Sequence, residues 1–355
     1  GFRKSGPVGS EKIEASANSV TAKLVAGPLE VGVSSGTLAL VLNQDGTKAL
    51  DASGSLLFSI AGFASVTATS VRVKFNTTTT DYEATPLAIN IDGVNATLAA
   101  ALNTTSVSVT GLSAEFASFV TITGNFGFRK SGPVGSEKIE ASANSVTAKL
   151  VAGPLEVGVS SGTLALVLNQ DGTKALDASG SLLFSVAGFA SVTATSVRVK
   201  FNTTTTDYEA TPLAINIDGV NATLAAALNT TSVSVTGLSA EFASFVTIGG
   251  NFGFRKSGAV GSEKIEASAN SVTAKLVAGP LEVGVSSGTL ALVLNQDGTK
   301  ALDASGSLLF SIAGFASVTA TSVRVKFNTT TTDYEATPLA INIDGVNATL
   351  AAALN

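Results

Sequence analysis

The chain has 355 residues, of which 45% are apolar and 13% are charged, and its net charge is −5. The apolar share is large enough for a substantial core, while the charged share is about half of that in ordinary soluble domains. No basic block is present, which argues against a nucleic-acid partner. No run of about 18 apolar residues indicates a transmembrane helix. The mean hydropathy of +0.40 predicts either apolar surface that neighbouring repeats or chains cover, or a tightly packed β protein.

Four residue types are missing from the sequence: Cys, His, Met and Trp. Without Cys there is no disulfide and no thiolate nucleophile. Without His there is no Ser-His-Asp triad, no imidazole base and no histidine metal ligand. Paired carboxylates remain as the one hydrolytic arrangement, but the lack of Trp argues against a sugar-binding cleft. We therefore expect a protein that is not an enzyme and that has no cofactor.

The sequence consists of one unit repeated nearly three times. The string GFRKSG begins at Gly1, Gly127 and Gly253, so the unit has 253 − 127 = 126 residues. Near-identical copies indicate a linear array in which every unit meets the same environment. We predict repeats at 1–126, 127–252 and 253–355, the last one incomplete, and expect this to be a window on a longer array. Only three positions differ among the copies: Pro7, Pro133 and Ala259; Ile60, Val186 and Ile312; Thr123 and Gly249.

Apolar residues recur with period two through the first half of each unit, which is typical of β-strands. The alternation predicts strands over 20–26, 29–34 and 38–42. Asp45-Gly46 then predicts a tight hairpin turn, because this pair accepts positive φ angles. A return strand is expected from Lys48 onward.

The stretch from Leu56 to Phe75 is predicted to be one long strand with a bend at Gly62. Its apolar residues change parity near Ser70, which predicts a β-bulge that moves the apolar set to the opposite face. Arg72 and Lys74 alternate with apolar neighbours. We expect them to be solvent-facing charges that discourage edge pairing.

The second half of the unit is more varied. Residues 76–80 read as a polar Thr-rich loop or the edge of a strand, and Asp92-Gly93 predicts a second tight turn. Leu98 to Leu102 is the one plausible helical turn, because Leu and Ala have high helix propensity. Phe116 to Phe128 reads as another long strand that runs across the repeat boundary.

The boundary between copies is strand-like, whereas separate domains need a flexible linker. We predict that the sheet continues from one unit into the next, giving an all-β fold of tandem repeats in an elongated continuous β rod or tube. A string of β-sandwich domains is the alternative, and no coil repeat of ~20 residues favours a solenoid. The predicted inter-repeat junction residues are Val120, Ile122, Phe126, Phe128, Val246, Ile248, Phe252 and Phe254.

Four acidic residues of the unit are weak candidates for a calcium site. Asp81 and Glu83 are the tightest pair, and Asp45 and Asp51 would meet across a hairpin. Calcium takes six to eight oxygen ligands, and no known calcium-loop motif is present. Because turn chemistry already explains Asp45, we expect no metal site.

The unit resembles the tandem repeats of very large bacterial surface proteins of the adhesin type. The resemblance rests on the run from Val120 to Lys130 and on the run from Gly36 to Gly54, and it would cover the whole chain. It implies secretion, an elongated form at the cell surface, and a role in attachment or in an extracellular fibre. The unit departs from calcium-dependent adhesin repeats in lacking calcium loops.

From these observations we predict a structural extracellular filament or tube protein built from stacked identical β repeats. Its partners would be neighbouring repeats and other copies of the same chain. The alternative is the repeat stalk of a bacterial adhesin that mediates cell–cell or cell–surface attachment.

Overall fold

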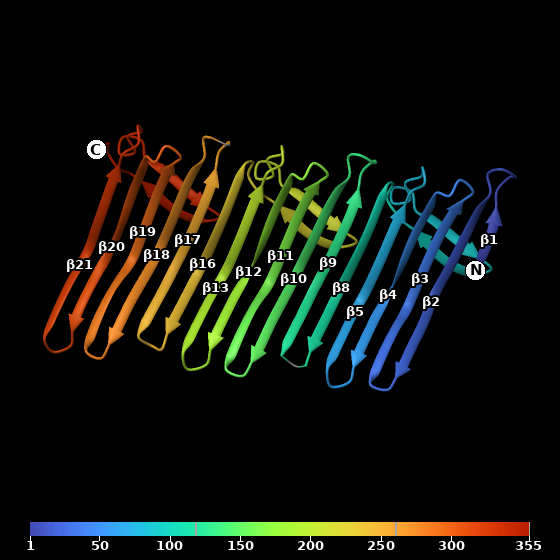
Figure 1. The fold of residues 1–355 in the computed structure, drawn as a ribbon, viewed down its shortest axis with the longest axis horizontal. Helices are drawn as coiled ribbons and strands as arrows, with labels where there is room; N and C mark the ends of the chain where they lie inside the picture. Colours follow the sequence, from blue (N-terminus) through green and yellow to red (C-terminus); the bar gives the residue numbers. More distant parts are fainter. Residues whose placement is uncertain (118, 260, 355) are drawn as a thin grey trace. The chain divides into compact units, whose positions relative to one another are not determined.

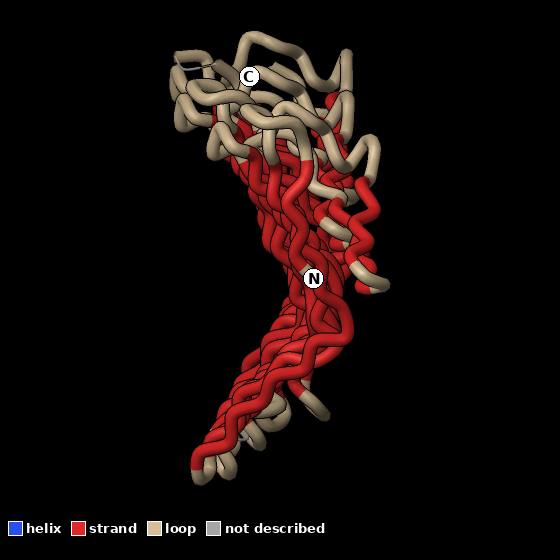
Figure 2. The backbone as a smooth tube through the Cα atoms, turned by 90° about the vertical axis from the view of Figure 1, so that its right-hand side faces the viewer, coloured by secondary structure: helices blue, strands red, loops and turns tan. Residues whose placement is uncertain are grey.

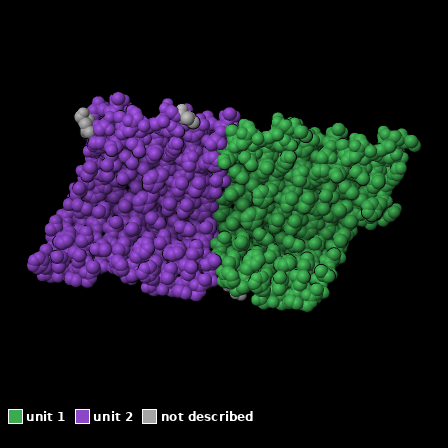
Figure 3. All heavy atoms as spheres, in the orientation of Figure 1, with its two compact units in different colours: residues 1–149, 162–174, 213–224 green, residues 150–161, 175–212, 225–355 purple. Residues whose placement is uncertain are grey.

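The computed structural model describes residues 1–117, 119–259 and 261–354. It divides into two compact units (Figure 3), one of residues 1–149, 162–174 and 213–224 and the other of residues 150–161, 175–212 and 225–355. The division passes through β10 (Lys138–Ala152) and β11 (Leu155–Asn169). Neither dividing strand lies at a repeat boundary, so the compact units are not the sequence repeats.

The first unit is built on a ladder of antiparallel strands that pair in chain order (Figure 1). β9 continues the ladder by pairing with β10. Two short hairpins, β6–β7 and β14–β15, are separate from this ladder. The strands are β1 (Phe2–Ser5), β2 (Lys12–Ala26), β3 (Leu29–Asn43), β4 (Lys48–Ile60), β5 (Ala64–Asn76), β6 (Leu87–Ile91), β7 (Val94–Leu98), β8 (Thr104–Phe116), β9 (Val120–Ser131), β14 (Leu213–Ile217) and β15 (Val220–Leu224).

The second unit has the same plan, with one antiparallel ladder and one separate hairpin, β22–β23. Its strands are β12 (Lys174–Val186), β13 (Ala190–Asn202), β16 (Thr230–Phe242), β17 (Val246–Ser257), β18 (Lys264–Ala278), β19 (Leu281–Asn295), β20 (Lys300–Ile312), β21 (Ala316–Asn328), β22 (Leu339–Ile343) and β23 (Val346–Leu350).

The predicted all-β array is confirmed, and the sheet continues through the repeat boundary. The boundary at 126/127 lies inside β9, and the one at 252/253 lies inside β17. Each of these strands pairs with the last strand of one repeat and the first strand of the next. Because no linker separates the copies at either boundary, the alternative of a string of sandwich domains is wrong.

Three local predictions are wrong. Residues 56–75 form two strands, because Gly62 adopts a φ of 76° and reverses the chain between β4 and β5. The strand predicted from Phe116 to Phe128 also divides: β8 ends at Phe116, and β9 begins at Val120. Residues 99–101 are irregular where a helical turn was expected, because the preceding residues are held in β7. No described residue belongs to a helix long and apolar enough to cross a membrane.

A β-bulge lies where the parity change in β5 predicted one. Gly54 of β4 pairs with Val71, whereas Leu56 pairs with Ala68, so β5 has one extra residue there. β3 also has one extra residue against β4, between Ser34 and Thr37. An extra residue exchanges odd and even positions. The apolar set therefore stays on one face, and the predicted move to the opposite face is wrong.

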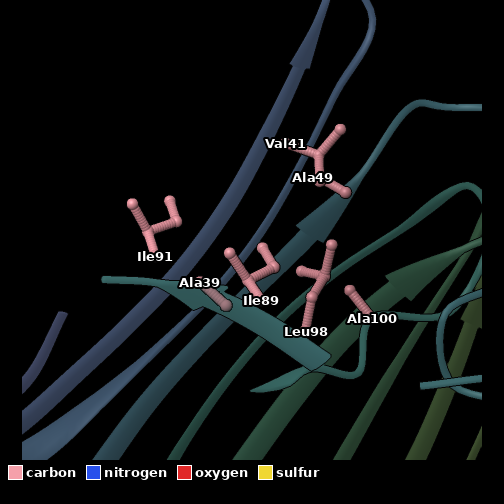
Figure 4. Packing of buried hydrophobic residues seen from close by; sticks show 7 residues of the cluster. All are labelled: Ala39, Val41, Ala49, Ile89, Ile91, Leu98 and Ala100. Atoms are coloured by element: carbon pink, nitrogen blue, oxygen red, sulfur yellow. The ribbon is translucent and has the colours of Figure 1, made fainter. Parts of the chain in front are cut away.

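One face of each ladder carries the short hairpins, and the other face is bare (Figure 2). Under the first hairpin, the small residues Ala39, Val41 and Ala49 leave room for larger side chains from above. The fully buried members of this cluster include Ile89 and Leu98 of the hairpin (Figure 4). Burial of such a side chain contributes about 2–3 kcal/mol. The second unit repeats the cluster under β22–β23.

Candidate functional site

The site lies where a hairpin of one repeat covers the end of the preceding repeat. β14 of repeat 2 contacts β8 and β9. β22 of repeat 3 likewise contacts β16 and β17, and it also reaches β18 of its own repeat. Each hairpin therefore spans a repeat boundary on the covered face of the sheet. We call this arrangement the inter-repeat clamp.

The cross-strand register brings charged residues together beneath the clamp. Lys74 lies opposite Asp51 on one side and Ser106 on the other, and Arg72 lies opposite Ser108. Directly opposite residues of an antiparallel pair share a face. The ladder therefore places two cations, one carboxylate and two hydroxyl groups side by side under the incoming hairpin.

Asp218 at the hairpin turn completes this cluster from the next repeat. Its Oδ1 lies 2.6 Å from the Nζ atom of Lys74, and the two side chains are 6% and 8% exposed. Ser108 donates a hydrogen bond of 3.3 Å to its other carboxylate oxygen. Breaking such a buried pair by removing one partner costs about 3–5 kcal/mol, because it leaves an unpaired charge. The pair therefore fixes the hairpin of repeat 2 on repeat 1.

The second boundary repeats this geometry with equivalent residues. Lys200 Nζ lies 2.5 Å from Asp344 Oδ1. Ser232 and Ser234 each donate a hydrogen bond of 3.4 Å to Asp344 Oδ2. The clamp is thus a property of the repeat rather than of one copy.

The clamp is also fastened within its own repeat. Arg129 donates to the carbonyl oxygen of Asn216 at 3.1 Å, and Ser142 donates to that of Val220 at 2.9 Å. Gly127 lies under Ile217, where a Cβ atom would come within 2.8 Å of the isoleucine Cβ. The first residue of the repeat is glycine because the hairpin approaches the sheet backbone there.

A second ion pair lies beside the clamp. Arg72 binds Asp51 through two hydrogen bonds of 2.8 and 2.6 Å, and the same carboxylate accepts one from the backbone N–H of Ala99. The hydrogen bonds with Asp51 are the main reason that the pKa of Arg72 is raised, and they outweigh its partial burial. This pair ties the segment that leaves β7 to β4 and β5.

Buried Glu140 organises the adjoining strand. It accepts hydrogen bonds from Lys138 and Arg129 at 2.9 and 2.8 Å. Burial raises the pKa of Glu140, but these two cations together outweigh it, so that the pKa lies below its ordinary value. Glu266 has the same partners in the next copy and the same direction of shift.

The expectation that Arg72 and Lys74 face solvent is wrong for Lys74, whereas the side chain of Arg72 is 34% exposed. Both lie on the face opposite Val71 and Val73, as their parity requires, but the hairpins cover that face. Lys74 is buried and paired with Asp218. One signal in the sequence indicates a separate hairpin, although it does not show where the hairpin packs: the two apolar runs around Asp92-Gly93 are too short to pair along the long strands.

The structure does not bring the four calcium candidates together. Asp45 accepts hydrogen bonds from the N–H and hydroxyl of Thr47, which lower its pKa, as the turn chemistry predicts. Asp51 binds Arg72, and Asp81 accepts hydrogen bonds from the N–H groups of residues 83 and 84. The Oε1 atom of Glu83 lies 3.8 Å from the Nζ atom of Lys74. Over residues 1–117, 119–259 and 261–354, no three acidic side chains are grouped as a metal ion requires.

The predicted junction residues all lie in the two strands that cross the boundaries, β9 and β17. Their even spacing places them on the bare face, opposite residues such as Phe116, Ala114, Val109 and Val107 of β8. Phe128 and Phe254 are 57% and 56% exposed. These residues therefore contribute to the bare face, opposite the face on which the clamp lies.

Comparison of the chain with protein-family models, with curated proteins and with solved structures finds no match. The site can thus be interpreted only from its own geometry. In the part of the chain that the structure describes, every buried side-chain nitrogen or oxygen has a hydrogen-bond partner. Such fully satisfied networks hold a structure in one arrangement.

Proposed function

We propose that this chain is part of a non-catalytic structural filament protein, in which stacked repeats extend one sheet. The observation that carries the proposal is the inter-repeat clamp on a strand that itself crosses the boundary. A copy is joined to the next by backbone hydrogen bonds along β9 and by the buried pair of Lys74 and Asp218. The backbone hydrogen bonds and the ion pair together would restrict bending and sliding of one repeat relative to the next.

The repeat distance follows from the strand count. Six pairings separate β2 from β10, its equivalent in the next copy. Neighbouring strands lie about 4.8 Å apart, so each repeat would add roughly 29 Å along the direction of strand pairing. In this proposal each added repeat lengthens the filament by the same distance and uses the same contacts as the repeat before it.

In this proposal the filament works outside the cell, as the resemblance to giant bacterial surface proteins implies. The repeat stalk of an adhesin is the alternative, and it uses the same joints. The two differ in lateral contacts between molecules, because an adhesin stalk acts as a single molecule. The bare apolar face favours the filament, since an isolated molecule would leave that face in water.

A distance measurement between two spin labels tests the rigid spacing. The chain has no cysteine, so Ser191→Cys and Ser317→Cys introduce the only two labelling sites. These exposed residues are equivalent positions of β13 and β21. We expect a narrow distance distribution centred near ~29 Å. A broad distribution would contradict the proposal, because it would mean that the copies move independently.

Electron microscopy of native material distinguishes the two functions. Regular filaments of constant width support the structural filament. Thin isolated strings would instead support the adhesin stalk.

A further inference from the structure

The bare face of the sheet is apolar over most of the length of its strands, with charged residues only at the loop end. Near the loops that carry the hairpins, Leu40 lies opposite Leu50, and Leu50 lies opposite Phe75. Toward the other end, Val31 lies opposite Phe58, and Phe58 lies opposite Val66. The residues of each of these two groups share one face of the sheet, because they lie directly opposite each other on neighbouring strands.

β4 shows that both groups belong to the same face. It has no extra residue between Leu50 and Phe58, so its even positions all point to one side. The bulges in β3 and β5 each add one residue, so that the outer half of β3 presents its odd positions on that side and the outer half of β5 its even positions. The extra residues in β3 and β5 thus keep the apolar sets of β3, β4 and β5 on a single face.

This face is uncovered in each unit. None of its leucine and phenylalanine side chains is among the buried residues of the described chain. In the second unit the face forms an open hollow of about 500 Å³, lined by residues that include Leu276, Val283, Leu308 and Phe310. The opposite face of the same strands is polar in its outer half, where Lys275 pairs with Glu282. The sheet is therefore strongly amphipathic.

The area of the face exceeds what a monomer ordinarily exposes. A strand of 13 residues such as β4 spans roughly 43 Å, and a repeat adds roughly 29 Å, so one repeat presents on the order of 1,200 Å². The largest apolar patch of a typical monomer is about 300–600 Å². A stable interface buries about 800 Å² on each partner. One repeat alone thus provides enough area for a stable complex.

We propose that a second copy of this chain covers the face, so that two sheets pack apolar side to apolar side. The face repeats every 126 residues, and another copy has the same period and therefore matches it along its length. Two such sheets would pack about 10 Å apart with interdigitating side chains. The charged residues of the face, Lys48 and Lys130, lie at its loop end. The contact area therefore contains no charge to bury.

The inference deepens the proposed function and rests on it, because a second copy can match the face only if the repeats are rigidly spaced. It gives the filament a partner and a thickness: two layers, with the hairpins on the outside. The clamp would then join copies along one chain, and the bare face would join two chains.

Charge placed in the middle of the face tests the pairing. The equivalent residues Phe58, Phe184 and Phe310 are replaced together by Glu, and self-association of the full chain is measured by analytical ultracentrifugation. The matched control replaces Ser59, Ser185 and Ser311 by Glu; these residues are next in the same strands and point to the other face. We expect the phenylalanine variant to weaken association at least ~100-fold, because a buried carboxylate without a partner is strongly unfavourable. The serine variant should associate as the original chain does.

A labelling experiment covers the case in which the charged variant fails to fold. Val66→Cys places a thiol on the bare face, and Ser65→Cys places one on the polar face. We expect a maleimide to react with Cys at position 66 at least ~10-fold more slowly at high than at low protein concentration, and with Cys at position 65 at the same rate. Equal rates at position 66 at every concentration would overturn the pairing.

Two further results separate the explanations. A monomeric chain that keeps the narrow ~29 Å label distance would overturn the pairing and leave the filament spacing intact. A broad distance would overturn the proposed function itself. Phosphatidylcholine vesicles serve as the alternative occupant: a chain that is monomeric in water and sediments with them would replace the second copy by a lipid surface.

Discussion

The hairpin turns of the first and second repeats have the same sequence but different surroundings. In repeat 2 the carboxylate of Asp218 is buried against Lys74 of the preceding copy. In repeat 1 the equivalent Asp92 is exposed. The neighbouring Val220 is completely buried, whereas Val94 is half-buried. The environment of an identical residue is therefore set by the adjoining copy.

The opposite half of the clamp shows the same contrast. Lys326, the counterpart of Lys74, is 31% exposed and pairs with Glu335 of its own repeat at 3.1 Å. Lys74 is within 3.8 Å of the matching Glu83 but makes its shorter contact with Asp218. The equivalent lysines thus differ in their nearest carboxylate, which is Asp218 of the next repeat for Lys74 and Glu335 of the same repeat for Lys326. The clamp forms when a neighbour supplies the hairpin.

Neutralising the turn carboxylate should give the largest difference between copies. Asp218→Asn should lower the free energy of unfolding by about 3 kcal/mol, because it leaves Lys74 buried without its main partner. Asp92→Asn should change it by less than about 0.5 kcal/mol, as surface substitutions usually do. Asparagine is chosen because both positions have a φ near 50°, which asparagine accepts. Urea unfolding of the two variants checks the prediction, and equal losses would contradict the clamp.

Shortening the hairpin valine should give a smaller difference. Val220→Ala should cost about 2 kcal/mol, because it leaves a cavity at a fully buried position. Val94→Ala should cost about 1 kcal/mol, because its side chain is only half-buried. The measurement is again urea unfolding, with the midpoint and slope compared between variants. A larger loss at Val94 than at Val220 would show that the neighbouring repeat does not determine burial there.

Acid should affect the first and second copies alike. Glu14 and Glu140 both have a lowered pKa, since burial raises it but their lysine and arginine partners outweigh burial. A carboxyl group with a lowered pKa stabilises the fold above its unfolded pKa, and that stability is lost as the pH falls through the folded pKa. We expect unfolding stability to decline below about pH 4.5 and the decline to be shallower, by a similar amount, in Glu14→Gln and in Glu140→Gln. Urea unfolding between pH 3 and pH 7 measures this. An effect confined to Glu140→Gln would mean that this cluster also depends on a neighbour.

The strands were predictable from the sequence, but the packing of the short hairpins on one face of the sheet was not. Period-two alternation indicates strands because side chains of a strand point alternately to its two faces. The turn at Asp92 was predicted because Asp-Gly accepts positive φ angles, and both residues adopt them. Gly62 was assigned to a bend, because one glycine inside an apolar alternation does not distinguish a bend from a reversal.

The inter-repeat clamp could not be predicted because it depends on packing between distant segments. Lys74 and Asp218 are 144 residues apart, and each has an ordinary local interpretation, one as a surface cation and the other as a turn residue. Nothing in the local pattern shows which sheet face a short hairpin will cover. Only the register, which aligns Lys74 with Ser106 and Asp51, shows that a carboxylate is needed there.

The row of bulges has a consequence for how such an array stays correctly assembled. In an alternating strand, a shift of two residues keeps the apolar side chains on the same face, so the alternation alone does not fix the register. Each bulge marks one level along the strand, and shifting a strand would move its extra residue away from the matching gap in its neighbour. The extra residues of β3 and β5 therefore disfavour every alignment in which a strand is shifted along its neighbour, so the same register recurs in each copy.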